Sequence, residues 1–161
     1  MRLATRRVHV AGIVRDTDAS GEWTLQIARN LTDAVDGFLQ GVTHLILDRD
    51  PLFTKPFRQL LRASGVRIVR LPKESPDLNA FAERWVRSVR TEALRRVIPL
   101  GEWHLRRVLS AYLVHYHRER PHQGLGGALI DPYDTADRAV GRIRFRKRLG
   151  GYLRYYYREA A

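Results

Sequence analysis

Hydrophobic positions in the first third of the chain change from a strand-like to a helical period. The segment Arg7–Val14 (RVHVAGIV) alternates loosely and is rich in Val and Ile, which predicts a strand. After a turn cluster, apolar residues recur at helical spacing: Trp23, Ile27, Leu31 and Val35. This spacing predicts an amphipathic helix over Glu22–Asp36, with a glycine near its end.

Two further short apolar runs follow, with a helix between them. Thr43–Leu47 is bounded by turn residues and is typical of a buried strand. A helix closed by Gly65 is indicated by three apolar residues, Phe57, Leu60 and Leu61. Val66–Leu71 then predicts another strand. Alternating strands and helices are typical of an α/β fold with parallel strand pairing.

The middle of the chain predicts two long helices. Ser75 is a good N-cap, with Pro76 at the first helical position and Asp77 near the positive end of the helix. We expect this helix to extend to about Val97, before Pro99. A further helix is expected from Glu102 to about His117.

The character of the chain changes after His122, where Gly and Pro accumulate. We therefore predict one domain over residues 1–122 and a linker with a basic tail over residues 123–161. Two alternating segments flank Gly150-Gly151 in the tail, which predicts a small β-hairpin.

Composition narrows the choice of partner. The 161 residues contain 29 Lys and Arg against 17 Asp and Glu, which gives a net charge of +12 and a pI near 10.9. Such a chain attracts polyanions, and nucleic acid is the commonest; the alternative is a basic protein with no such partner. The chain has no cysteine, so it forms no disulfide and no thiolate metal site. We expect neither a membrane span nor a signal peptide, and a cytoplasmic location.

Two acidic residues stand where chemistry could occur. Asp48 directly follows the run Thr43–Leu47, and sites in open α/β sheets form at the carboxyl ends of strands. Alternatively, Asp48 only begins a turn in Asp48-Arg49-Asp50-Pro51. Taken alone, the position of Asp48 favours this structural interpretation.

Glu83 lies in the first predicted long helix and shares a face with two arginines. Glu83, Arg87 and Arg90 are spaced i, i+4 and i+7, while the apolar stripe falls elsewhere, on Leu78, Phe81, Trp85 and Val89. The alternative here is an ordinary solvated Glu–Arg pair. Asp48 and Glu83 are 35 positions apart.

Three segments of the chain stand out together: THLILDRDPLFT, VRIVRLPKESPDLNAFAERWVRSVRTEAL and YLVHYHRERPHQGL. Together they resemble the DDE family of insertion-sequence transposases and retroviral integrases, and the resemblance covers roughly residues 5 to 126. In that family an Asp after a buried strand and a Glu on a later helix stand at a similar separation. The resemblance implies an RNase H-like fold, with Asp48 and Glu83 as metal ligands and with Arg87 and Arg90 contacting DNA.

The chemistry implied by this resemblance is DNA strand cleavage and strand transfer. Two Mg²⁺ (or Mn²⁺) ions about 4 Å apart stabilise the attacking and leaving oxygens, and carboxylates are suitable hard ligands. The family's first Asp lies on an opening strand that we do not find in this sequence. Asp16 and Asp18 are the only earlier acids, and both fall in a turn. We therefore expect an integrase core that lacks its first one or two strands and is inactive by itself.

Other residues support weaker hypotheses. Four histidines (His104, His115, His117 and His122) are not expected to bind zinc, because no paired ligand cluster is visible. The helix-end motif, with Tyr112, Tyr116, Arg118, Arg120, Pro121 and His122, suggests packing or DNA contact. The tail residues Arg142–Arg148 and Tyr155–Tyr157 suggest electrostatic contact with a nucleic-acid backbone, or a solvated basic tail.

The sequence thus supports a first hypothesis of a transposase core of a mobile element, active in DNA integration and recombination. The alternative is a non-catalytic DNA-binding or regulatory remnant that joins a full-length transposase. A third possibility is a decayed gene product that folds poorly. DNA is the expected partner, together with a second copy of the chain or a full-length transposase; a membrane is not.

Overall fold

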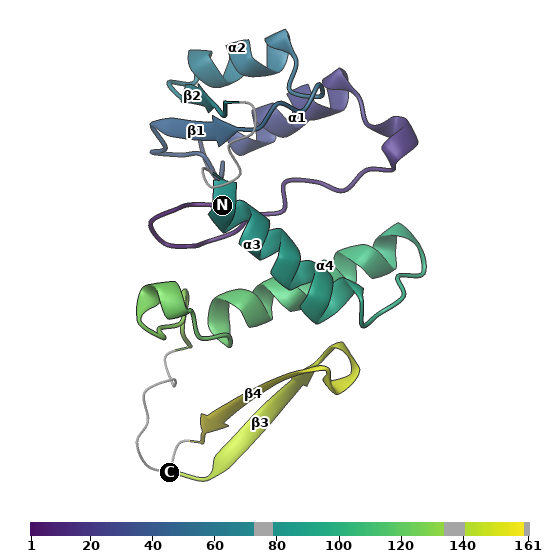
Figure 1. Ribbon diagram of the computed structural model, residues 1–161, viewed down its shortest axis with the longest axis vertical. Helices are drawn as coiled ribbons and strands as arrows, with labels where there is room; N and C mark the ends of the chain where they lie inside the picture. The colour runs from purple at the N-terminus through teal and green to yellow at the C-terminus, as the bar shows by residue number, and fades with distance from the viewer. Residues whose placement is uncertain (73–78, 134–140, 160–161) are drawn as a thin grey trace. The chain divides into compact units, whose positions relative to one another are not determined.

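The computed structural model describes residues 1–72, 79–133 and 141–159, in two compact units (Figure 1). The first, called here the α/β unit, is His9–Ala80. The second, the helix–hairpin unit, combines Met1–Val8 with Phe81–Ala161. The boundary proposed above at residue 122 stays a prediction.

The α/β unit contains two helices and a two-stranded sheet. Its elements are the 3₁₀ turn η1 (Asp16–Asp18), α1 (Gly21–Leu31), β1 (His44–Leu47), α2 (Lys55–Ala63) and β2 (Arg67–Arg70). β1 and β2 pair in parallel, with His44 opposite Arg67 and Leu47 opposite Arg70. The predicted mixed α/β class and parallel pairing are both confirmed.

One apolar cluster holds this unit together. Its buried members come from both helices, from β1 and from the loops: Ala28, Leu39, Leu47, Phe57, Leu61 and Val66. Local signals set the helix ends. The Ser20 side chain accepts a hydrogen bond from the backbone N–H of Trp23, and Pro56 stands in the first turn of α2, where its missing N–H costs little.

The strand predicted at Arg7–Val14 is wrong, because no strand forms there. A strand needs a neighbouring strand to accept and donate its backbone hydrogen bonds. Among the described residues, β1 pairs only with β2 and offers no such neighbour to this segment. The Val8 N–H donates instead to Nε2 of His117, at 3.0 Å. For the same reason β1 is less buried than predicted: in a two-stranded sheet only Leu47 of this strand is buried.

The first helix is also shorter than predicted. α1 ends at Leu31, and the Val35 side chain is 88% exposed. The Asp33 carboxylate accepts hydrogen bonds from the backbone N–H groups of Val35 (2.8 Å) and Asp36 (3.3 Å). This Asx-type turn satisfies the backbone locally and so competes with helix continuation, which helical spacing alone does not reveal.

The helix–hairpin unit contains the long helices and the tail. Its elements are α3 (Ala80–Val89), the π-helical turn η3 (Arg90–Leu94), α4 (Gly101–Arg118), η4 (Gln123–Leu125), β3 (Ile143–Arg148), η5 (Leu149–Gly151) and β4 (Leu153–Arg158). The predicted second long helix is confirmed as α4. The predicted first one is α3 continued by η3; its N-cap at Ser75–Asp77 lies outside the described residues.

The predicted hairpin is confirmed. β3 and β4 pair antiparallel, from Ile143 opposite Arg158 to Arg148 opposite Leu153. Gly150 (φ 67°) and Gly151 (φ 98°) have left-handed backbone conformations, which glycine adopts without steric cost.

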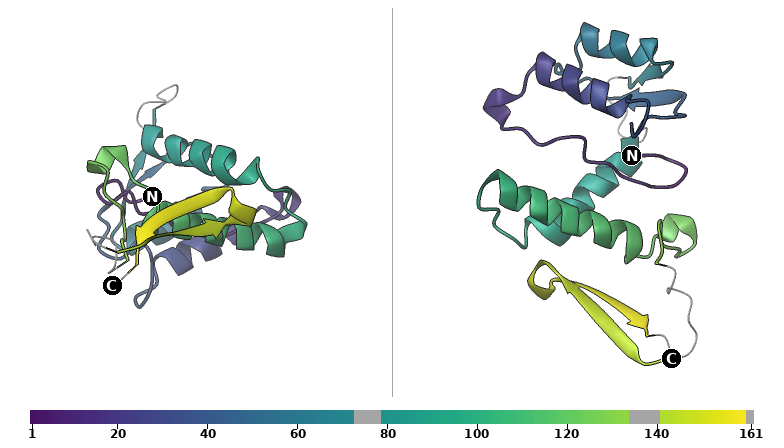
Figure 2. Two further views of the ribbon diagram at one scale, coloured as in Figure 1. Left: turned by 90° about the horizontal axis from the view of Figure 1, so that it is seen from below. Right: turned by 180° about the vertical axis from the view of Figure 1, so that it is seen from behind.

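α4 lies between α3 and the hairpin (Figures 1 and 2). A single buried cluster joins these layers to the first residues of the chain: Val8, Val89, Ala93, Val108, Tyr112, Tyr116 and Leu153. The apolar stripe predicted for α3 is confirmed for Val89, which is buried, and Trp85 packs against the same cluster. Phe81, at the start of the stripe, remains 39% exposed.

Two bidentate ion pairs reinforce this core. Arg120 donates to both carboxylate oxygens of Glu92 (3.0 and 3.2 Å), and the Tyr112 hydroxyl donates to the same carboxylate. Arg148 on the hairpin donates to both oxygens of Glu119 (2.6 and 2.8 Å). The Glu119 side chain is only 1% exposed, so this pair ties the end of α4 to β3 in a nearly dry setting.

Charge pairing decides the ionisation of Glu119. Burial by itself would raise the pKa of this carboxyl, but hydrogen bonds from Arg148 and contact with His115 outweigh burial and lower the pKa. Burial, aided by the adjacent Glu92 carboxylate, raises the pKa of Tyr112, so its hydroxyl stays protonated as a donor.

Replacing Glu119 with Gln should destabilise the protein, because the Arg148 charge would lose its partner in a mostly buried site. We expect a loss of about 2 kcal/mol in the free energy of unfolding, measured by urea denaturation. The matched control is Glu102→Gln, which removes an exposed i,i+4 pair with Arg106 and should cost about 0.5 kcal/mol or less. Equal losses in the two variants would show that the Glu119–Arg148 pair does not stabilise the fold.

Candidate nucleic-acid interface

Asp48 lies where the sequence predicts it, directly after β1, and its side chain is exposed. Its Oδ1 accepts a hydrogen bond from the Asp50 N–H (3.1 Å), and the Asp50 Oδ1 accepts one from the Leu52 N–H (2.8 Å). The turn interpretation therefore describes part of what Asp48 does. Among the described residues Asp48 has no ion pair.

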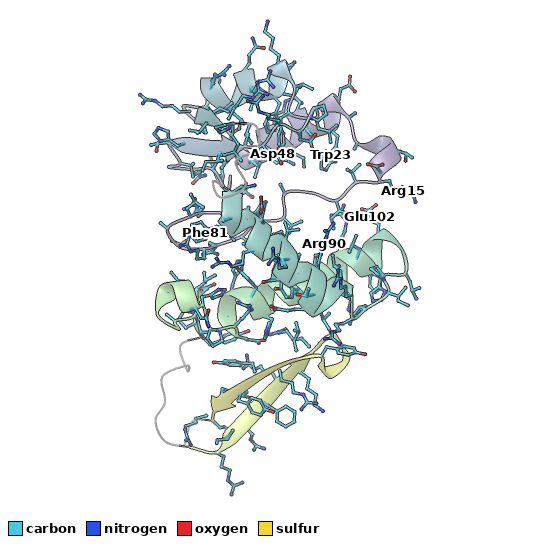
Figure 3. All side chains as sticks on the ribbon, viewed as in Figure 1. Arg15, Trp23, Asp48, Phe81, Arg90 and Glu102 are labelled. Carbon is cyan, nitrogen blue, oxygen red and sulfur yellow. The ribbon has the colours of Figure 1, made fainter. Side chains whose placement is uncertain are left out.

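Glu83, Arg87 and Arg90 are all exposed on α3 and on the first residue of η3; Figure 3 labels Arg90. The alternative interpretation, a solvated Glu83–Arg87 ion pair, is not seen: within the described parts of the chain, neither residue has an ion-pair partner within 4.0 Å. One face of the helical segment therefore presents to solvent one carboxylate and two guanidinium groups that have no ion-pair partner among the described residues.

The joint site of Asp48 and Glu83 stays a prediction, because the two residues belong to different compact units. Asp48 belongs to the α/β unit and Glu83 to the helix–hairpin unit. In the described regions, no three His, Asp or Glu side chains gather closely enough to hold a metal ion. Within the described residues of its own unit, neither carboxylate has neighbouring acidic or histidine side chains that would complete the several ligands that Mg²⁺ requires.

A basic pocket in the helix–hairpin unit was not predicted. It measures about 330 Å³ and includes three arginines, Arg6, Arg84 and Arg120, in its lining. The Arg6 guanidinium lies 3.6 Å from the centre of the Phe81 ring, a cation–π contact that holds it over the start of α3. Arg84 and Arg120 stand on or beside helices that the sequence predicts, but the contribution of Arg6 depends on a contact across 75 positions.

The helix-end motif has a packing role. Tyr112 and Tyr116 are buried in the core, and the buried His122 ring approaches the Tyr116 ring at 4.6 Å. Nε2 of His122 lies 2.7 Å from the Tyr116 carbonyl oxygen, so it donates to that carbonyl. Arg118 differs, since it points outward and pairs with Asp131.

Burial also keeps the histidines of this region uncharged. It is the largest influence on the pKa values of His115, His117 and His122, and each of these values is lowered. The Val8 N–H donates to Nε2 of His117, which requires that nitrogen to be unprotonated. These rings therefore act as packing and hydrogen-bonding groups of the fold.

Residues 64–129 match the family model described as the integrase core domain. The matched region contains Glu83, Arg87 and Arg90 together with β2, α3 and α4; Asp48 lies outside it. This match supports an integrase-core family, as the sequence resemblance implied, and a transposase or integrase type of function. Searches among curated proteins and among solved structures found no match. No helix in the described residues is long and apolar enough to cross a membrane.

The buried histidines predict a loss of stability at mildly acidic pH. Their folded-state pKa values lie below the ordinary value of 6.5, so the unfolded chain binds more protons as the pH falls through 6.5. The free energy of unfolding should be level above about pH 7.5 and fall between pH 6.5 and 5.

The variant His117→Gln tests this origin, because an amide oxygen can accept the Val8 N–H without titrating. Its unfolding free energy, followed by urea denaturation across the same pH range, should fall less steeply than that of the parent. An unchanged slope below pH 6.5 would exclude His117 as a source of the pH dependence.

Proposed function

We propose that this chain binds DNA as part of an integrase- or transposase-type machinery for DNA integration and recombination. The observation that carries the proposal is the exposed face formed by Glu83, Arg87 and Arg90, which lies within the region matching the integrase core domain. All three side chains lack ion-pair partners among the described residues, so they remain available to a ligand.

Charge supports DNA as that ligand. The chain carries a net charge of +12, and each arginine that meets a phosphate releases a condensed counterion into solution. Guanidinium groups also match phosphate geometry through paired hydrogen bonds. Arg87 and Arg90 are separated by one helical turn, which suits contact with successive phosphates of one strand.

For strand cleavage and transfer, we propose Asp48 and Glu83 as carboxylate ligands. Divalent ions such as Mg²⁺, when bound in such a site, stabilise the charges that develop on the attacking and leaving oxygens. The family resemblance implies a third carboxylate, which these 161 residues do not offer at a matching position. Catalysis would then require that group from elsewhere, and we expect the chain by itself to bind DNA without cutting it.

A second candidate function is non-catalytic, either as a DNA-binding protein or as a regulator that associates with another copy or with a full-length transposase. It is favoured by the turn role of Asp48, whose carboxylate is already engaged by the Asp50 N–H. Under this alternative, DNA binding depends on the arginines of α3 and η3 and is indifferent to Asp48.

The double variant Arg87→Gln/Arg90→Gln should weaken binding to duplex DNA and lower its salt dependence. The slope of log K against log salt should fall by about 1.8, which corresponds to two lost phosphate contacts. The measurement is fluorescence anisotropy over a salt series. The matched control, Arg29→Gln/Arg62→Gln, removes the same charge from exposed positions of α1 and α2. If the two double variants lose the same slope, the α3 face is not the specific contact.

Purified chain incubated with Mg²⁺ or Mn²⁺ and a nicked or blunt DNA substrate should give no cleavage and no strand transfer. A gel assay with end-labelled DNA measures both. Strand transfer that disappears in Glu83→Gln would contradict the expectation of inactivity and establish catalysis by the chain alone. DNA binding that survives Asp48→Asn unchanged is expected under both candidate functions.

A further inference from the structure

The hairpin register separates its residues into two faces. Side chains of paired residues lie on the same face of a hairpin, and successive residues alternate. One face, called here the inner face, consists of Arg144, Arg146, Arg148, Leu153, Tyr155 and Tyr157. The outer face consists of Ile143, Phe145, Lys147, Arg154, Tyr156 and Arg158.

Inner-face residues are engaged within the fold. Leu153 is buried in the core, Arg148 is held by Glu119, and Arg144 is paired with Glu159 at 2.9 Å. Arg146 lies between two tyrosine rings, 4.6 Å from the centre of the Tyr133 ring and 4.9 Å from that of Tyr157. Every inner-face arginine therefore has a carboxylate or an aromatic partner.

The outer-face cations have no acidic partner among the described residues. In the part of the chain that the structure describes, Lys147, Arg154 and Arg158 form no ion pair. Arg154 donates to the Gly151 carbonyl and Arg158 to the Gly141 carbonyl, and the Lys147 ammonium group lies 5.2 Å from the centre of the Phe145 ring on the same face. Lys147 also stands directly opposite Arg154, and like charges at directly paired positions destabilise a hairpin. A bound anion would relieve that repulsion.

The same face exposes aromatic rings. Phe145 is 52% exposed and Tyr156 is 60% exposed, and the two form a cross-strand pair with ring centres 5.9 Å apart. Ile143, beside them, is 65% exposed. Rings that a globular fold would bury are thus held at the surface, while cations flank them on both strands.

We propose that the outer face of the hairpin binds single-stranded nucleic acid. Unpaired bases would stack on Phe145 and Tyr156, and the neighbouring phosphates would meet Lys147, Arg154 and Arg158. Base faces are accessible in a single strand and hidden in a duplex, so the exposed rings distinguish the two ligands. This inference goes beyond the proposed function, since it depends on the hairpin alone and not on Asp48 or Glu83.

Fluorescence anisotropy of the full chain with a labelled oligo-dT of twenty nucleotides tests the proposal. The variant Phe145→Leu/Tyr156→Leu should bind this strand at least about tenfold more weakly, while its binding to a duplex of equal length changes less than about twofold. Tyr156→Phe retains both rings and should bind like the parent. Lys147→Gln/Arg154→Gln should lower the salt slope for the single strand by about 1.4, whereas Arg144→Gln, an inner-face control, should lower it far less.

Several outcomes would overturn the proposal. Equal losses for single strand and duplex in the double Leu variant would show that the rings do not stack on bases. Displacement of the oligonucleotide by a polyglutamate peptide at equal charge concentration would make the face a general anion or acidic-peptide site. The same anisotropy measurement with labelled oligo-U compares the affinity for single-stranded RNA with that for single-stranded DNA. Thermal unfolding checks that each variant is folded, and the Arg87→Gln/Arg90→Gln variant reports separately on the α3 face.

Discussion

The packing of the helix–hairpin unit depends on ion pairs between two of its carboxylates and two arginines. In a chain with 29 basic and 17 acidic side chains, Glu92 and Glu119 each accept both hydrogen bonds of one guanidinium group. Glu92 ties η3 to Arg120, just after α4, and Glu119 ties the end of α4 to β3. Both pairs are bidentate, which requires the partners in one geometry, and the nearly complete burial of the Glu119 carboxylate makes the Glu119–Arg148 pair stronger than a surface ion pair.

This pairing also determines which cations face outward without a partner. Arg120 and Arg148 are neutralised inside the unit, and Arg144 and Arg146 are engaged on the inner face of the hairpin. Among the described residues, the exposed cations without an ion pair include Arg87 and Arg90 near α3, and Arg154 and Arg158 on the outer face. A polyanion is the ligand that such surfaces attract, which agrees with the match to an integrase core domain.

The sequence was most informative where the decisive interactions are local. Glycines at a turn and alternating flanks predicted the hairpin, and short apolar runs around a helical pattern predicted the parallel pairing of β1 and β2. The strand predicted at Arg7–Val14 does not form, because none of the described strands pairs with this segment. The alternation of residues within the segment does not indicate whether a partner strand is present. The predicted extension of the first helix to Val35 and Asp36 was wrong because the Asp33 side chain binds the backbone N–H of Val35 beyond the end of α1.

Longer-range contacts were not predictable from the pattern of residues. Glu92 and Arg120 are 28 positions apart. Glu92 lies in η3 and Arg120 in the loop after α4, so the two side chains meet only when α4 has packed against η3. The contact between Arg6 and Phe81, which helps to form the basic pocket, is of the same kind. For the candidate site, the sequence predicted the exposed positions of Glu83, Arg87 and Arg90, but whether Asp48 joins them depends on two units that fold around separate cores.

The most direct test of the division between paired and unpaired cations is arginine footprinting. The chain would be treated with a dicarbonyl reagent that modifies accessible guanidinium groups, with and without bound DNA, and each site quantified by mass spectrometry. We expect DNA to protect Arg87, Arg90, Arg154 and Arg158, while Arg120 and Arg148 stay slow to react in both states because Glu92 and Glu119 hold them. Protection confined to other arginines, such as Arg29 and Arg62 on α1 and α2, would contradict this account.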